Sequence, residues 1–137
     1  MSSGNGTEAS ERSVRTRWEG GMRALTNVGD FEVVVDEPET AGGTDSGPQP
    51  TDLLLASVSS CFALALAFTA RKRGVELRDL DITAVGRYEG LRFDRISLSV
   101  SSASPSDVVQ DLVPEAQRVC YVSNTLLQSP ELIVEVR

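Results

Sequence analysis

An uncharged segment near the middle of the chain most constrains what this sequence can fold into. Residues 53–70 carry no charged side chain, and they begin LLLASVSSCFALALAF, which is mostly apolar. Thr51 and Asp52 precede the segment, as an N-cap and as an acid at the positive end of a helix dipole. The basic run RKR and then Gly74 follow it, as expected for a last turn and a left-handed C-terminal residue. The pattern predicts one long helix.

A helix this apolar suits either a membrane or a protein interior. The 18-residue segment is at the lower limit for a bilayer span, and it contains several serine and alanine residues. Charge-rich segments follow it closely, so we expect a buried helix and no membrane association. Apolar residues cover nearly its whole circumference, which marks a helix buried on most sides. One domain from a chain of 137 residues has trouble covering such a helix, and this favours an obligate homodimer.

The remaining sequence predicts a single α+β domain. Residues 1–12 have the composition of a disordered tail, and 13–137 fit one domain of ordinary size. Strand patterns occupy 14–18, 22–28, 31–37, 75–90, 91–103 and 131–136. A second helix is expected over 104–120, where Pro114 should break or kink it, followed by a short helix or turn. Counting the first three strands and the long helix, the order is β-β-β-α-β-β-α-β.

Composition excludes several classes of function. The formal net charge of -7 argues against binding to a nucleic-acid backbone. The absence of histidine removes imidazole bases, and two cysteines cannot fill a four-ligand zinc site. We therefore expect no metal or other cofactor. The N-terminus lacks the apolar stretch of a secretory signal, so we expect a cytoplasmic protein, where a permanent structural disulfide is unusual.

Cys61 and Cys120 are the main candidates for covalent chemistry. Either could be a structural thiol, since free cysteine is among the most buried residue types. Ser59 and Ser60 leave room beside Cys61, and a helix starting near Ser123 would favour a thiolate at Cys120. On the residues alone, inert and reactive thiols both stay open.

Three motifs, in order, resemble the OsmC/Ohr family of thiol-dependent peroxidases. The stretch GPQPTDLLLASVSSCFALALAFTARKRGVELRDLDI is similar to the family's Pro-x-acid-Leu-Leu-Leu-Ala segment and its cysteine-bearing central helix. GGMR at 20–23 is similar to the N-terminal hairpin of the family. AQRVCYVSNTL at 116–126 is similar to its second motif, usually Cys-Pro-Val-Ser. The resemblance covers about residues 14–137.

The resemblance implies an intertwined α+β homodimer with its two active sites at the subunit interface. The implied activity is reduction of hydroperoxides, often organic ones, in stress defence. Cys61 would be the peroxidatic thiolate, and Cys120 would resolve its sulfenic acid as a disulfide, which an external dithiol reduces. Arg23, in GGMR, is the implied cationic partner of the thiolate, and Arg17 is a second candidate.

Two departures make the chain similar to a divergent OsmC-like branch. The best peroxidases of the family hold the arginine with a glutamate ten residues before the cysteine, where this chain has Thr51. Asp52 could clamp the arginine instead, or could serve the start of the helix. Tyr121 replaces the proline after the second cysteine, as a pocket wall or as core. The alternative is a non-enzymatic protein of this fold that binds a small apolar ligand or senses redox state.

Overall fold

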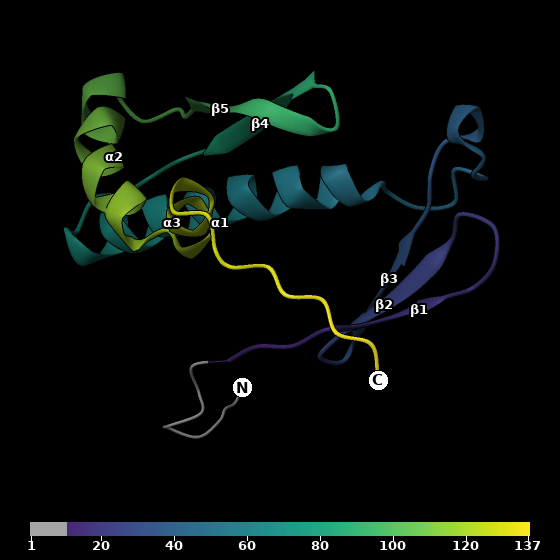
Figure 1. Ribbon diagram of the computed structural model, residues 1–137. Helices are drawn as coiled ribbons and strands as arrows, with labels where there is room; N and C mark the ends of the chain where they lie inside the picture. The colour runs from purple at the N-terminus through teal and green to yellow at the C-terminus, as the bar shows by residue number, and fades with distance from the viewer. Residues whose placement is uncertain (1–10) are drawn as a thin grey trace. The chain divides into compact units, whose positions relative to one another are not determined.

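The computed structural model describes residues 11–137, so the tail expected over 1–12 lies mainly outside the described residues. The described chain forms two compact units, an N-terminal unit up to Leu53 and a C-terminal unit from Leu54 onward. The elements follow one another as β1, β2, β3, η1, α1, β4, β5, α2 and α3 (Figure 1). The expected mixed α+β architecture is therefore confirmed.

The N-terminal unit is built on a three-stranded antiparallel sheet in the order β1-β2-β3. Its strands are β1 (Arg15–Trp18), β2 (Ala24–Val28) and β3 (Phe31–Val35). Val28 pairs with Phe31, so the β2–β3 hairpin turns through two residues, and Gly29 takes a φ of 59° there. This is the Gly-Asp turn that the sequence predicts.

A tightly packed loop connects β3 to the long helix and contains the short 3₁₀ helix η1 (Glu39–Ala41). A side chain at Gly43 or Gly47 would collide with the backbone carbonyl of Glu37 or Val34, respectively. Only glycine allows the chain to approach itself this closely. The glycine-rich composition of the loop is therefore a packing requirement.

Helix α1 (Pro50–Lys72) begins two residues earlier than an N-cap at Thr51 predicts. Proline suits a first helical position because its missing N–H has no partner there, so Thr51 lies in the first turn and is not the N-cap. The Asp52 carboxylate accepts the N–H of Gln49 at 3.1 Å, a capping contact across the helix start. The structure thus places Asp52 in a helix-start role.

The other end of α1 closes as the sequence predicts. Gly74 has a φ of 68°, and the N–H of Val75 donates to the carbonyl of Ala70 at 2.8 Å. These are the contacts of a Schellman motif. Helix α1 is long and apolar enough to cross a bilayer by length and composition alone, as core helices of soluble proteins also are; 33% of its most apolar window is buried in the chain.

In the C-terminal unit, β4 (Asp81–Glu89) and β5 (Arg92–Ser101) form an antiparallel ribbon, shorter than predicted at its start. The pairing shifts at Arg87, so that Asp94 is an extra residue in β5. Phe93 and Ile96 are three residues apart, a spacing that would place them on opposite faces of a regular strand. The bulge restores them to one face.

Two helices complete the unit, α2 (Ser106–Val119) and α3 (Tyr121–Leu127). Pro114 was expected to break or kink this helix; the break is wrong, since α2 continues through it, and the kink stays a prediction. Pro114 removes the hydrogen bond to the carbonyl of Gln110, but both residues are exposed, so water can solvate that carbonyl. Helices α1 and α2 are also joined by Glu115, which pairs with Lys72 and Arg73 at 2.8 Å each.

The core of this unit is apolar and lies where the helices meet one face of the ribbon. Leu66 on α1 and Leu112 on α2 are fully buried at its centre. The remaining buried members of the cluster are Phe62, Ala65, Ala70, Ala116 and Cys120. Ile82, Leu98 and Val100 of the ribbon pack against this cluster. The alternation read from the β5 sequence therefore describes the buried face correctly.

The closing strand predicted over 131–136 is wrong for the single chain. Residues 128–137 have no helix or strand, and Leu132, Ile133, Val134 and Val136 are all exposed. The sequence has the alternating character of a strand, but a strand also needs a neighbour to accept and donate its backbone hydrogen bonds. No segment of the described chain pairs with it.

Candidate functional site

The C-terminal unit brings the two cysteines together. Cys61 lies in the fourth turn of α1 and is half-buried, whereas Cys120 is fully buried between α2 and α3. The two thiols lie close enough for each to shift the pKa of the other, although the two residues are 59 positions apart in the sequence. Both are free cysteines in this structure. Contact between two thiols on different elements is the geometric requirement for forming and breaking a disulfide between them.

Cys120 owes its position to a one-residue interruption between two helices. Its φ of -88° and ψ of 105° are extended, so α2 ends before it and α3 begins after it. The backbone N–H groups of Tyr121 and Val122 lower the pKa of Cys61, and those of Val122 and Ser123 lower the pKa of Cys120. The first turn of α3 therefore supplies donors to both sulfurs.

The environment separates the pKa values of the two thiols. Burial raises the pKa of Cys61, and this outweighs the N–H groups of Val122 and Tyr121. Burial also disfavours the Cys120 thiolate, but hydrogen bonds from Ser123, Cys61 and Val122 outweigh it and lower the pKa of Cys120. A peroxidatic role requires a lowered pKa at Cys61. The surroundings of Cys61 in α1 and α3 do not lower it.

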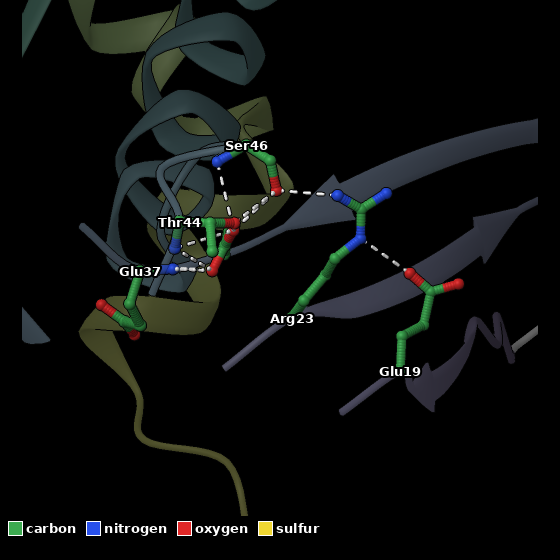
Figure 2. Close-up of polar contacts among 6 residues, drawn as sticks. Glu19, Arg23, Glu37, Thr44 and Ser46 are labelled. Carbon is green, nitrogen blue, oxygen red and sulfur yellow. Dashed lines mark hydrogen bonds and ion pairs between the residues drawn. The ribbon is translucent and has the colours of Figure 1, made fainter. Parts of the chain in front are cut away.

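Arg23, the expected cationic partner, lies in the N-terminal unit just before β2. Its Nε donates to Glu19 at 2.9 Å and its Nη1 donates to the Ser46 hydroxyl at 2.8 Å, as Figure 2 shows. Arg17 lies on β1, opposite Leu25, and is exposed. Neither Glu19 nor Ser46 was expected as a partner of the arginine. Approach of Arg23 to a thiol stays a prediction.

The Ser46 hydroxyl contacts a buried carboxylate, that of Asp36, which is 1% exposed. It accepts the hydroxyls of Ser46 and Thr44 at 2.6 Å each, together with the N–H groups of Glu37, Thr44 and Ser46 (Figure 2). The hydroxyls of Ser46 and Thr44 in particular hold the pKa of Asp36 well below its usual range. Asp36 is therefore anionic, and it fixes the loop that follows β3.

The other predicted site residues lie apart from these contacts or serve the helix start. Thr51 and Asp52 occupy the first turn of α1, where Asp52 caps Gln49. Tyr121 is the first residue of α3 and its side chain is 83% exposed, so the single chain does not bury it as core. Its backbone N–H, not its ring, contacts the thiol of Cys61.

A hollow of about 960 Å³ lies beside the thiols in the C-terminal unit. Its walls include Phe62 of α1, Ile96 and Leu98 of β5, and Val109 of α2. Ser123 also lines it, and this residue hydrogen-bonds Cys120. The cysteines themselves are not among its lining residues. The hollow is large and apolar enough for a small organic ligand.

These features define a class: α+β proteins in which a long apolar helix carries one thiol of a contacting cysteine pair. Within that class the chain can be placed in a particular family. Residues 43–135 match the family model described as OsmC-like protein, which is more than half of the chain. The chain therefore belongs to the OsmC-like family, and the predicted family is confirmed.

Individual relatives agree with this assignment. An uncharacterized protein of Haloferax volcanii is 27% identical over 115 residues, covering 79% of this chain and 81% of its own. The OsmC-like protein from Mycoplasma pneumoniae has a TM-score of 0.71 at 14% identity, covering 87% of this chain and 89% of the other. An organic hydroperoxide resistance protein OsmC from Legionella pneumophila has a TM-score of 0.63 at 20% identity, covering 86% and 90%. At these identities the solved structures show the shared fold.

Sequence reasoning missed most of the residues that surround the candidate groups. Glu19 lies four residues before Arg23, a spacing that could have suggested an ion pair. Asp36 directly follows an apolar strand and precedes a loop with Thr44 and Ser46, which is a recognisable pattern for a buried carboxylate with hydroxyl donors. Nothing in the linear spacing of 23 residues between Arg23 and Ser46 indicates their contact.

Proposed function

We propose that this protein reduces organic hydroperoxides with its two cysteines, using an external dithiol as the final reductant. The observation that carries the proposal is the proximity of the Cys61 and Cys120 thiols, each of which shifts the pKa of the other. Membership of the OsmC-like family supports it, as do structural neighbours named as organic hydroperoxide resistance proteins. Stress defence in the cytoplasm is part of the proposal.

The chemistry balances in three steps. The Cys61 thiolate attacks one peroxide oxygen, the O–O bond breaks, and the alkoxide leaves and takes up a proton as the alcohol. Cys61 is then a sulfenic acid, which the Cys120 thiolate attacks to form the S–S bond and release water after protonation. The dithiol reduces this disulfide and becomes oxidised itself. Cys61 is the peroxidatic residue because it is half-buried, whereas Cys120 is fully buried.

In this proposal Arg23 supplies the positive charge that the Cys61 thiolate needs. Burial of Cys61 in the C-terminal unit raises its pKa, so a cation from elsewhere must stabilise the charged form. The Arg23 guanidinium is permanently charged, and as a planar fork of donors it suits an anion and a peroxide oxygen together. Loss of Arg23 should therefore slow the first step more than the second.

We further propose that the protein works as a homodimer with its active sites at the interface. Exposed apolar surface on a soluble chain marks an interaction site. Leu64 and Phe68 of α1 are exposed, and so is the apolar C-terminal segment from Leu132 to Val136. Light scattering of the purified chain should give about twice the 14.7 kDa of the monomer. A monomer at micromolar concentration would contradict this part of the proposal.

The test of the function is peroxide turnover with a dithiol donor for the wild type, Cys61→Ser and Cys120→Ser. Cumene hydroperoxide and hydrogen peroxide are compared, with the donor alone as the blank. We expect Cys61→Ser to lose turnover, and Cys120→Ser to stop after one equivalent with a sulfenic acid that dimedone traps. Wild-type turnover no faster than the blank would exclude the peroxidase function.

A second candidate function is the binding of a small apolar ligand without turnover, or redox sensing. The apolar hollow beside Ser123 favours it, since neither thiol lines that hollow. A solvatochromic dye such as ANS should then bind the reduced protein with saturation, and Ile96→Asp should abolish binding without altering the reactivity of the cysteines. Saturable binding combined with absent peroxide turnover would select this candidate.

A further inference from the structure

We propose that Glu19 and Ser46 are positioning residues for Arg23, with Ser46 itself fixed by the buried Asp36. In the peroxidases that the chain resembles, a glutamate at the position of Thr51 holds the arginine. The structure assigns that task here to two residues from other segments, one before β2 and one in the loop after β3. This inference rests on the proposed function, which gives Arg23 its role.

The contacts of Glu19 and Ser46 hold the Arg23 guanidinium from two directions. Glu19 accepts from Nε at 2.9 Å and Ser46 accepts from Nη1 at 2.8 Å, so two different nitrogens of the guanidinium are held (Figure 2). Two hydrogen bonds to one planar group fix its orientation, whereas one would leave it free to rotate. In this proposal the remaining nitrogen of Arg23, Nη2, is the one that serves the Cys61 thiolate.

Ser46 is itself held rigidly by two hydrogen bonds to Asp36. Its hydroxyl has one proton, which it donates to Oδ2 of Asp36 at 2.6 Å, while its backbone N–H donates to the same oxygen at 3.1 Å. The hydroxyl oxygen must therefore present a lone pair elsewhere, and Arg23 lies in that direction. Because Asp36 is anionic, it polarises the Ser46 hydroxyl and makes it a better acceptor for the guanidinium.

The Arg23 guanidinium lies in a small hollow and is partly exposed to water. Arg23 lines a hollow of about 210 Å³ whose other walls include Trp18, Met22 and Pro50. The Arg23 side chain is 44% exposed and that of Glu19 is 32% exposed, so water screens their ion pair. Glu19 and Ser46 therefore contribute through the orientation of the guanidinium more than through net stability.

The test measures the pKa of Cys61 without relying on peroxide turnover. In a Cys120→Ser background, the rate of alkylation by neutral iodoacetamide is followed against pH. Ser46→Ala and Glu19→Ala are compared with Arg23→Ala, and Ser46→Thr serves as a conservative variant that keeps the hydroxyl. Thr44→Val is the matched control: Thr44 also donates to Asp36 at 2.6 Å, its contact with the Ser46 hydroxyl is long at 3.4 Å, and no described contact joins it to Arg23.

We expect Ser46→Ala and Glu19→Ala to raise the apparent pKa of Cys61 and to slow alkylation at neutral pH by about 3–10-fold, since one pKa unit is a factor of ten in thiolate population. Arg23→Ala should produce at least as large a shift. Ser46→Thr should restore the wild-type profile, and Thr44→Val should leave it unchanged. Thermal unfolding of Ser46→Ala and Thr44→Val separates loss of loop stability from loss of positioning.

The outcomes distinguish this inference from the proposed function. If Arg23→Ala shifts the pKa of Cys61 but Ser46→Ala and Glu19→Ala do not, the positioning role is excluded and the arginine keeps its function. If Thr44→Val shifts it as much as Ser46→Ala, the effect is a general loss of loop structure and the inference is also excluded. If Arg23→Ala itself has no effect, both the arginine's role and the inference fail, whatever the rate of peroxide turnover.

Discussion

Each of the two units buries ionisable side chains, and the two environments differ in how many hydrogen-bond donors they supply. In the N-terminal unit, Asp36 is surrounded by donors and is kept as an anion. In the C-terminal unit, Cys61 and Cys120 share a few N–H donors inside an apolar core, which pushes their pKa values apart. A fully satisfied anion is inert and organises its loop. A partly satisfied thiol pair retains chemistry.

The largest expected effect concerns the apolar core that surrounds the thiols. Leu66 is fully buried, so Leu66→Ala should lower the free energy of unfolding by about 2–5 kcal/mol through lost burial and a residual cavity. Urea unfolding followed by circular dichroism measures this. Leu91→Ala, at the exposed hairpin tip, is the control and should stay within about 0.5 kcal/mol of wild type. Equal losses for both variants would contradict the described core.

Removing the charge of Asp36 should act more locally. Asp36→Asn keeps the size of the side chain but replaces an acceptor oxygen with an N–H₂ group that faces hydroxyl and amide donors. We expect residues 37–48 to open, with proteolytic cleavage in this loop faster by at least about tenfold. Cleavage sites are located by mass spectrometry. Unchanged cleavage would show that the loop is held by its glycine packing alone.

A smaller effect is expected at the hydroxyl that supports Cys120. The Ser123 hydroxyl donates to the Cys120 carbonyl at 3.3 Å, and this side chain lowers the pKa of the Cys120 thiol. Ser123→Ala should therefore raise that pKa and slow the alkylation of Cys120 at neutral pH by about 2–5-fold. Mass-resolved labelling of each cysteine in the reduced protein measures this. Thr125→Val, which removes a hydroxyl of the same helix bonded to Tyr121, should leave both labelling rates unchanged.

The smallest effect concerns the ion pairs that join α1 and α2. Hydrogen bonds from Lys72 and Arg73 lower the pKa of Glu115 from 4.5 to about 2, so the folded state prefers the charged form. Its stabilisation is complete above pH 4.5 and is lost as the pH falls towards 2. Glu115→Gln should therefore lower the melting temperature at pH 7 by about 2–4 °C. The difference from wild type should vanish near pH 2, and Glu89→Gln is an exposed control.

The sequence predicted the elements whose patterns are local. The long helix carries its start and stop residues within a few positions of its ends, and the β2–β3 hairpin carries its glycine at the turn. The strand expected over 131–136 failed because a strand depends on a partner that no local pattern specifies. The break expected at Pro114 does not occur, because its cost depends on whether the freed carbonyl of Gln110 reaches water, which is a property of the packed structure.

The residues of the candidate site also differ in whether a local sequence pattern identifies them. The two cysteines could be named from sequence because they are rare and because their flanking motifs resemble a family. The contacts of Arg23 could not, since the relevant residue Ser46 is brought to it by a carboxylate buried in a different part of the unit. The split in the thiol pKa values depends on which N–H groups of one short helix point at which sulfur. Such directions exist only after folding.

The bulge at Asp94 has a consequence for how this chain tolerates changes in length. Because Asp94 is the extra residue, deleting it alone would leave Phe93 and Ile96 two positions apart, which is still one face of a regular strand. A one-residue deletion elsewhere in β5, for example of Ser97, would instead exchange the buried and solvent-facing positions of every side chain on one side of it. The ribbon should therefore tolerate a one-residue deletion at its bulge better than at other positions of β5, while the turn at Gly90 can vary in length.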